Sequence, residues 1–160
     1  SSIRSVINWY IESLNAITFE NNIITIQIAL ETLSYIVLVE VNNILDEKEF
    51  DRNFTSKNLK MLLEFCKIPY GKDELEIFDD CIVDKFEDGV DIFIYYRNSI
   101  VHPSSKSNIH ILSAEDMWNI ISIGTRYVEL VLLNIIGYKG EYSNRLKYRS
   151  FGEVELVPWI

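Results

Sequence analysis

Residues 23–45 constrain the fold more than any other part of the chain. Ile, Val and Leu dominate this stretch, but Gln27, Glu31 and Glu40 interrupt it. A membrane-spanning helix needs about 20 predominantly apolar residues, and the polar interruptions leave this run short of that requirement. The stretch therefore predicts a long helix buried in a protein core, and it argues against a membrane partner.

Apolar residues outside this stretch recur at intervals of three and four, which is the spacing of an amphipathic helix. They predict a first helix over residues 3–18, which an Asn-Asn break at 21–22 separates from the core helix. Residues 46–53 are expected to be a charged connector. Thr55 or Ser56 is expected to cap a third helix, which the turn at Pro69-Tyr70-Gly71 ends. Further helices are expected over residues 75–86 and from about 88–91 to 102.

The last expected helix is marked at both ends. Ser113 and Asp116 have the spacing of a capping box, with Asp in place of the usual Glu, and Gly137 suits the residue that closes a helix. The tail lacks helical periodicity, and residues 152–158 are expected to form a short strand or an extended arm. The chain has neither β-α-β alternation nor a glycine-rich phosphate loop.

These elements predict an all-α helical bundle. A length of 160 residues suits one domain, and 48% hydrophobic residues supply a sizeable core. We expect the bundle to cover residues 1–137 and a C-terminal arm, residues 138–160, to pack on the same domain. Two cysteines without metal-ligand spacing indicate a reduced, cytoplasmic setting. The ends of the chain fit either a complete protein or a domain of a longer one.

The net charge of −9 argues against a broad nucleic-acid-binding surface, because phosphate binding depends largely on Lys and Arg. The charge is unevenly distributed. Residues 73–91 hold nine acids against Lys85, a net charge of −8, whereas residues 139–149 hold four bases against Glu141, a net charge of +3. Any contact with RNA should therefore favour the second half of the chain.

The sharpest chemical motif is Arg97-Asn98-Ser99-Ile100-Val101-His102-Pro103. Arg97 falls on the stripe of an otherwise apolar helix, where a permanently charged guanidinium needs a partner. Pro103 disfavours helical geometry at the residue before it, so the helix should end near His102 and leave the imidazole accessible. Arg97 and His102 lie about 140° apart around a regular helix, so a frayed last turn and the long arginine side chain must bring their functional groups together.

The segment from Arg97 to His102 resembles the R-x4-6-H motif of HEPN domains, the higher eukaryote and prokaryote nucleotide-binding family. Residues 28–33, which include Glu31, are similar to the acid-bearing long helix of the ApeA-like HEPN branch, a group associated with bacterial anti-phage defence. The order of the expected helices extends the resemblance over roughly residues 1–137. It implies a helical bundle and, as in many members, a metal-independent ribonuclease without a cofactor.

The resemblance implies that RNA is cleaved when a ribose 2′-hydroxyl attacks the neighbouring phosphodiester, which leaves a 2′,3′-cyclic phosphate. His102 would be the general acid or base, because an imidazole with an ordinary pKa of about 6.5 transfers protons near neutrality. Arg97 would stabilise the charge that develops on the phosphate. Asn98 would orient the imidazole or contact phosphate, and Glu31 would pair with Arg97 or position the 2′-hydroxyl.

Basic residues after the motif are candidates for RNA binding. Those of the arm alternate with aromatic side chains that can stack on bases, and one more lies in the polar loop after His102. The set comprises Lys106, Lys139, Arg145, Lys147 and Arg149. The alternative is that the basic arm packs on the body of the protein or against a partner domain.

The motif residues have structural alternatives as well. Arg97 could hold a buried carboxylate, His102 could cap the last carbonyls of its helix, and Glu31 could form a purely structural pair. The acidic run at 73–91 lacks the glycine and the spacing of a calcium loop, and the two histidines lack zinc-ligand spacing. We therefore expect no metal site.

HEPN ribonucleases generally place two motifs across a dimer cleft, so the resemblance implies a homodimer. Its substrate would be RNA, with tRNA as one candidate, and a sensor or regulatory domain could lie outside this chain. The alternative function is a catalytically inactive HEPN module that dimerises, binds a nucleotide or contacts a partner protein. The acidic net charge favours that alternative.

Overall fold

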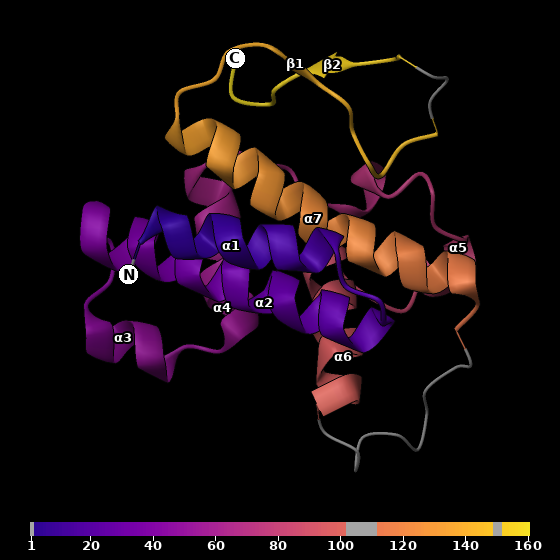
Figure 1. The fold of residues 1–160 in the computed structure, drawn as a ribbon, viewed down its shortest axis with the longest axis horizontal. Helices are drawn as coiled ribbons and strands as arrows, with labels where there is room; N and C mark the ends of the chain where they lie inside the picture. Colours follow the sequence, from indigo (N-terminus) through magenta and orange to yellow (C-terminus); the bar gives the residue numbers. More distant parts are fainter. Residues whose placement is uncertain (1, 102–111, 149–151) are drawn as a thin grey trace.

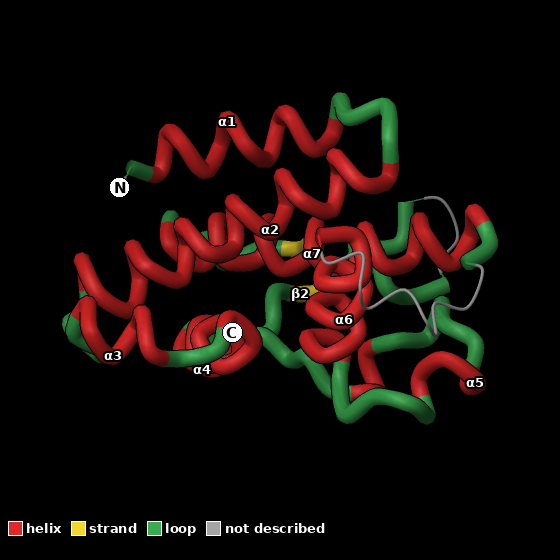
Figure 2. The backbone as a smooth tube through the Cα atoms, turned by 90° about the horizontal axis from the view of Figure 1, so that it is seen from below, coloured by secondary structure: helices red, strands yellow, loops and turns green. Residues whose placement is uncertain are grey.

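The chain folds mainly into helices, which confirms the all-α prediction (Figure 1). The computed structural model describes residues 2–101, 112–148 and 152–160. Three helices form the centre of the fold: α2 (Phe19–Tyr35), α6 (Gly89–Val101) and α7 (Ala114–Ile135). Helix α1 (Ile3–Leu14) runs beside α2 in both views (Figures 1 and 2).

Helix α2 is the core helix that the sequence predicts. It continues as the π-helix η1 (Ile36–Val41), so the helical stretch covers Phe19–Val41. By length and composition alone this stretch could cross a membrane, but 56% of its apolar window is buried inside the protein. Ile23, Ile26 and Leu33 are fully buried. The burial fits a core helix, because its apolar side chains already have protein neighbours.

The three central helices meet closely at Gly124. A Cβ built on this glycine would lie 2.5 Å from Ile26 Cγ2 on α2 and 2.5 Å from Phe93 Cε2 on α6. Only a residue without a side chain allows α7 to approach both neighbours at this point. Gly124 therefore allows α6, the helix that carries Arg97, to pack closely against α7.

The first two helices are divided at a different place from the one predicted. Helix α1 ends at Leu14 rather than at residue 18, and Ile17 is 99% exposed in the connection. Thr18 caps α2 by accepting a hydrogen bond from the Asn21 backbone. The predicted Asn-Asn break at 21–22 therefore lies inside the first turn of α2, because the cap three residues earlier starts the helix.

Two further segment predictions were wrong. Residues 46–53 are not simply a connector, because Asp46 and Glu49 form a capping box that starts the short helix α3 (Glu47–Arg52). The segment 75–86 contains only the four-residue helix α5 (Asp80–Val83), preceded by the 3₁₀ turn η2 (Lys72–Glu74). The Asp79 side chain accepts from the Cys81 backbone there, so this residue begins a turn where a continuous helix was expected.

The remaining helix boundaries follow the sequence more closely. Helix α4 (Thr55–Phe65) lies where a helix is predicted, but the predicted cap is wrong, because Phe54 occupies the cap position and Thr55 and Ser56 are already helical. Lys67 adopts a positive φ of 55° just after the helix ends. The predicted capping box between Ser113 and Asp116 opens α7. Gly137, with a φ of 69°, follows the end of that helix as expected.

The arm after α7 is extended, as the sequence predicts. Its strands β1 (Glu141–Tyr142) and β2 (Glu155–Leu156) form an antiparallel pair. The Leu146 side chain is fully buried, and its carbonyl accepts a hydrogen bond from the Ile77 backbone. The described part of the arm is therefore packed on the helical body.

Candidate functional site

Arg97 and Asn98 lie in the last turn and a half of α6. Arg97 Nη1 donates a hydrogen bond to Asn98 Oδ1 at 3.0 Å, so the neighbouring residue holds the guanidinium. The Arg97 Nε atom is buried and has no hydrogen-bond partner among the described residues. His102 lies outside the described residues. Of the Arg97, Asn98 and His102 candidates, the structure therefore describes the side chains of Arg97 and Asn98 alone.

The position of Arg97 on its helix differs from the expected one. The sequence pattern placed it in the middle of a buried stripe, but that stripe runs through Val90, Phe93, Tyr96 and Ser99. Arg97 is half-buried at the edge of the buried face, on the same side of the helix as Val90 and Phe93, which precede it by seven and four residues. No carboxylate in the described part of the chain forms an ion pair with it. The guanidinium therefore has donor capacity that protein carboxylates do not use.

Glu31 lies in a small polar pocket between α2 and the segment from α3 to α4. Its Oε1 accepts a hydrogen bond from Gln27 Nε2 at 2.7 Å and a longer one from Thr55 Oγ1 at 3.4 Å. The pocket has a volume of about 210 Å³ and also includes Asn58. Both recorded partners of Glu31 come from α2 and α4, so its carboxylate is not paired with Arg97.

Two of the arm cations are used in ion pairs within the protein. Arg145 forms two hydrogen bonds with Glu129 on α7, at 2.7 and 2.8 Å, and Lys147 Nζ lies 3.1 Å from Glu155 Oε2. Both pairs join parts of the arm to each other or to the body, as the packing alternative predicts. Lys139 is exposed. Lys106 and Arg149 lie outside the described residues.

Sequence reasoning missed a buried arginine on α7. Arg126 is 1% exposed, and its Nη2 lies 2.8 Å from Glu74 Oε2. Its Nη1 donates to the Pro69 carbonyl at 2.9 Å. Arg126 interrupts an apolar helix as Arg97 does, and this signal in the sequence could have identified it. Its partners show a structural role, since they tie the segment before α5 to the centre of α7.

A second ion pair joins α4 to the start of α6. Lys60 Nζ lies 2.7 Å from Asp88 Oδ2 and 2.9 Å from Asp91 Oδ1. Burial disfavours the charged ammonium, but the hydrogen bonds and negative charges of both aspartates outweigh this effect and raise the pKa of Lys60. Asp88 also accepts from the Asp91 backbone and so caps α6. These contacts fix the N-terminal end of the motif helix.

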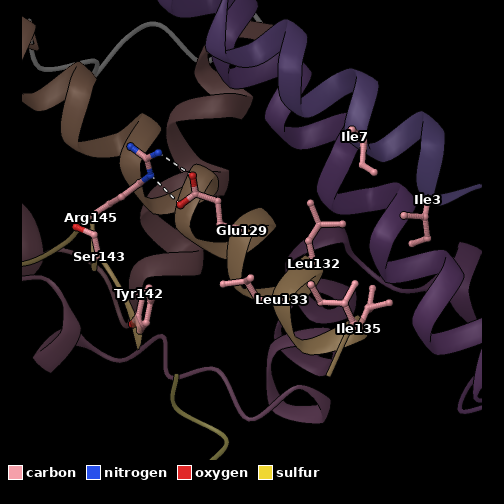
Figure 3. Close-up of a pocket in the computed structure, with 10 residues that line it drawn as sticks. Ile3, Ile7, Glu129, Leu132, Leu133, Ile135, Tyr142, Ser143 and Arg145 are labelled. Atoms are coloured by element: carbon pink, nitrogen blue, oxygen red, sulfur yellow. Dashed lines mark hydrogen bonds and ion pairs between the residues drawn. The ribbon is translucent and has the colours of Figure 1, made fainter. Parts of the chain in front are cut away.

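A large cavity lies away from the motif, between α1, the end of α7 and the arm (Figure 3). Its volume is about 600 Å³. The apolar part is formed by Ile3 and Ile7 of α1 and by Leu132, Leu133, Ile135 and Ile136 of α7 and the residue after it. The polar end is formed by Glu129, Tyr142, Ser143 and Arg145. We call this cavity the α1–α7 pocket.

A hydrogen-bonded trio closes the polar end of the α1–α7 pocket. Tyr10 donates to Glu129 Oε1 at 2.6 Å, and Arg145 donates to both oxygens of the same carboxylate. Burial, followed by the hydrogen bond to Glu129, raises the pKa of Tyr10 to about 12. Tyr10 therefore stays protonated near neutral pH and remains a donor to Glu129.

The sequence matches a family model over nearly its whole length. A family described as the YopA C-terminal domain matches residues 1–156. The SPbeta prophage-derived uncharacterized protein YopA of Bacillus subtilis (strain 168) is 34% identical over 160 residues, which cover 96% of this chain and 34% of the relative. The chain thus spans about a third of the length of that curated relative. No solved structure matches the chain.

Proposed function

The chain belongs to the YopA C-terminal domain family, and we propose that it is a HEPN-type endoribonuclease or ribonuclease effector domain that cleaves RNA without a metal. In this proposal a ribose 2′-hydroxyl attacks the adjacent phosphodiester. His102 transfers the proton, and Arg97 stabilises the charge on the phosphate. The protein would act in the bacterial cytoplasm, in anti-phage or toxin-like defence.

The availability of the Arg97 guanidinium is the observation that carries this proposal. Its recorded partner is the neutral side chain of Asn98, and its Nε has none within the described residues. The guanidinium of Arg126 is instead neutralised by Glu74. An arginine held in place by a neutral neighbour keeps its charge for an anionic ligand, and its planar donors match the oxygens of a phosphate.

The described part of the arm adds little free positive charge to the proposed RNA contact. Arg145 and Lys147 are engaged with Glu129 and Glu155, so they contribute little free charge to an RNA surface. The contact would depend on Arg97, on the exposed Lys139 and on Lys106, which lies outside the described residues. A homodimer would place two such motifs together and double the local positive charge, which would help an acidic chain bind RNA.

The name of the relative adds modest support. The relative is named as a prophage-derived, uncharacterized protein. A protein retained on a prophage fits a role in the conflict between phage and bacterium, which is the setting proposed here. The relative is also about three times as long as the matched region, which leaves room for a sensor or regulatory domain in the same chain.

The proposal is tested by incubating the purified chain with labelled total RNA and tRNA in the presence of EDTA. We expect cleavage by the wild type, products with 2′,3′-cyclic phosphate ends, and loss of cleavage in Arg97→Ala and His102→Ala. Arg52→Ala is the matched control, because Arg52 is exposed on α3 and donates from Nε to the Lys48 carbonyl. Equal cleavage by all four proteins would exclude the assigned site.

The second candidate function is a catalytically inactive interaction module. The observation that favours it is the apolar surface of α1, where Ile7, Ile11 and Leu14 are between 42% and 54% exposed. Neighbouring apolar side chains on one helix face are typical of a protein-binding surface. Absence of cleavage by the wild-type domain, together with oligomerisation that Ile11→Glu abolishes, would favour this function over the ribonuclease.

A further inference from the structure

The α1–α7 pocket has the size and the lining of a site for a small molecule. Its volume of about 600 Å³ lies within the range of roughly 300–1,000 Å³ that is typical of ligand pockets. Such pockets combine apolar walls with a few polar groups that orient the ligand. Figure 3 shows this division, with Arg145, Ser143 and Glu129 at one end and Ile3, Ile7 and Ile135 at the other.

The apolar end offers a surface for a hydrocarbon chain. Ile7 is 42% exposed and Ile135 is 40% exposed, although both line the pocket. Helix α1 packs against α2 and buries Val6 and Ser13, whereas its Ile3 and Ile7 side chains line the pocket. An apolar occupant would remove these side chains from water, which is the main driving force for binding apolar groups.

The polar end favours an uncharged oxygen over a carboxylate. Glu129 is already satisfied by Tyr10 and by two bonds from Arg145. These two bonds use Nε and Nη2 of Arg145, so the guanidinium keeps other N–H donors, and Ser143 adds a hydroxyl. The charges of Arg145 and Glu129 cancel, so a ligand carboxylate would bring an unbalanced negative charge next to Glu129 in a chain of net charge −9.

We propose that the α1–α7 pocket binds an uncharged amphipathic molecule, with its alkyl chain between α1 and α7 and a hydroxyl or carbonyl oxygen near Arg145 and Ser143. This site is independent of the proposed ribonuclease activity. Its residues come from α1, the end of α7 and the arm, whereas Arg97 and Asn98 belong to α6. Failure of one proposal therefore leaves the other intact.

The test compares 1-octanol with octanoate, two probes of equal chain length that differ in the charge of the head group. Binding to the whole chain is followed by chemical-shift changes of the Ile and Leu methyl groups in NMR titrations. We expect saturable binding of 1-octanol, with shifts centred on Ile7, Leu132 and Leu133, and binding of octanoate at least tenfold weaker. Absence of saturable 1-octanol binding, or tighter binding of octanoate, would overturn the proposal.

Variants of pocket residues test whether 1-octanol binds in the α1–α7 pocket. Ile7→Glu and Ile135→Glu place a charge in the apolar end at positions that already contact solvent, and each should weaken 1-octanol binding at least tenfold. Phe54→Glu is the matched control, because Phe54 is 84% exposed and is not part of the pocket. Circular dichroism checks the fold of each variant. Unchanged binding by both folded pocket variants would place the probe elsewhere and overturn the proposal.

Sedimentation of the same proteins tests whether a second copy of the chain, in place of a small molecule, occupies the pocket. If a second copy of the chain occupies the pocket, the wild type should be a dimer and Ile7→Glu should dissociate it. In that dimer 1-octanol should not bind in the pocket. That combination would overturn the small-molecule proposal. A change in RNA cleavage has no bearing on either result, so failure at this pocket is distinguishable from failure of the ribonuclease site.

Discussion

Arg126 Nη2 lies 2.8 Å from Glu74 Oε2, and this ion pair joins the middle of α7 to the segment that precedes α5. Arg126 is almost fully buried, whereas Glu74 is 15% exposed. Arg97 also interrupts an apolar helix, but its guanidinium contacts the neutral Asn98 side chain. The two arginines therefore differ in their partners, and this difference separates a structural residue from a candidate functional one.

Replacing each arginine by Met should separate the two roles in stability. Arg126→Met leaves Glu74 and the Pro69 carbonyl without their partner, and we expect the free energy of unfolding to fall by about 3 kcal/mol. Arg97→Met breaks no ion pair among the described residues and should change the free energy of unfolding by less than about 1 kcal/mol. Urea denaturation followed by circular dichroism measures both values. Equal losses would show that Arg97 is structural too.

Gly124 should not tolerate a methyl group. In an exposed helix, Gly→Ala stabilises by about 1 kcal/mol, but here the new Cβ would lie 2.5 Å from Ile26 and from Phe93. We expect Gly124→Ala to lower the free energy of unfolding by roughly 1–3 kcal/mol, because the two helices must move apart. Thermal unfolding provides the measurement. Trp118→Ala, at a 62% exposed position of the same helix, is the control, and a stabilised Gly124→Ala protein would contradict the close crossing.

Two tyrosines should respond oppositely to loss of their hydroxyl groups. The buried Tyr127 hydroxyl has no hydrogen-bond partner among the described residues, and burial raises its pKa. Tyr127→Phe should therefore stabilise the protein by about 1 kcal/mol, since a desolvated polar group is removed. Tyr10→Phe should destabilise it by about 1.5 kcal/mol, because Glu129 loses a charged hydrogen bond. Urea denaturation of both variants tests the contrast, and a loss in Tyr127→Phe would reveal an unrecognised partner.

Helix positions were predictable from the sequence where periodicity and caps agree. The apolar spacing and the Ser113–Asp116 box together predict the start of α7, and the structure confirms it. The 75–86 segment has helical spacing as well, but Asp79 starts a turn within it and only Asp80–Val83 is helical. Local hydrogen bonds to backbone groups compete with a helix there, and periodicity alone does not measure that competition.

Side-chain partners far apart in the sequence were not predictable. Arg145 was a candidate for RNA binding, but its partner Glu129 lies on α7, and only the fold brings the two together. Glu31 was a candidate partner of Arg97, but it accepts from Thr55 of α4, which only the fold brings near it. Its other partner, Gln27, lies one helical turn away on α2 and is a local contact. The α1–α7 pocket likewise joins residues from both ends of the chain, so no local motif indicates it.

The Glu155 carboxylate should make the arm sensitive to acid. Burial by itself would raise its pKa, but hydrogen bonds from Tyr142, Asn144 and Lys147 outweigh that effect and lower the pKa from the ordinary value of 4.5. A lowered pKa in the folded state means that the stabilisation is complete above pH 4.5 and is lost as the pH falls through the folded value. The packing of β1 against β2 should therefore weaken only at strongly acidic pH.

The Asn144 side-chain amide reports this titration directly, because its Nδ2 donates to Glu155 Oε1 at 2.8 Å. We expect its NMR resonances to shift with a midpoint below pH 4.5 and to lose that transition in Glu155→Gln. Glu141→Gln, which removes an exposed carboxylate from the neighbouring strand, should leave the transition in place. A midpoint above 4.5 would mean that burial dominates over the three donors, and the arm would then lose stability at milder acidity.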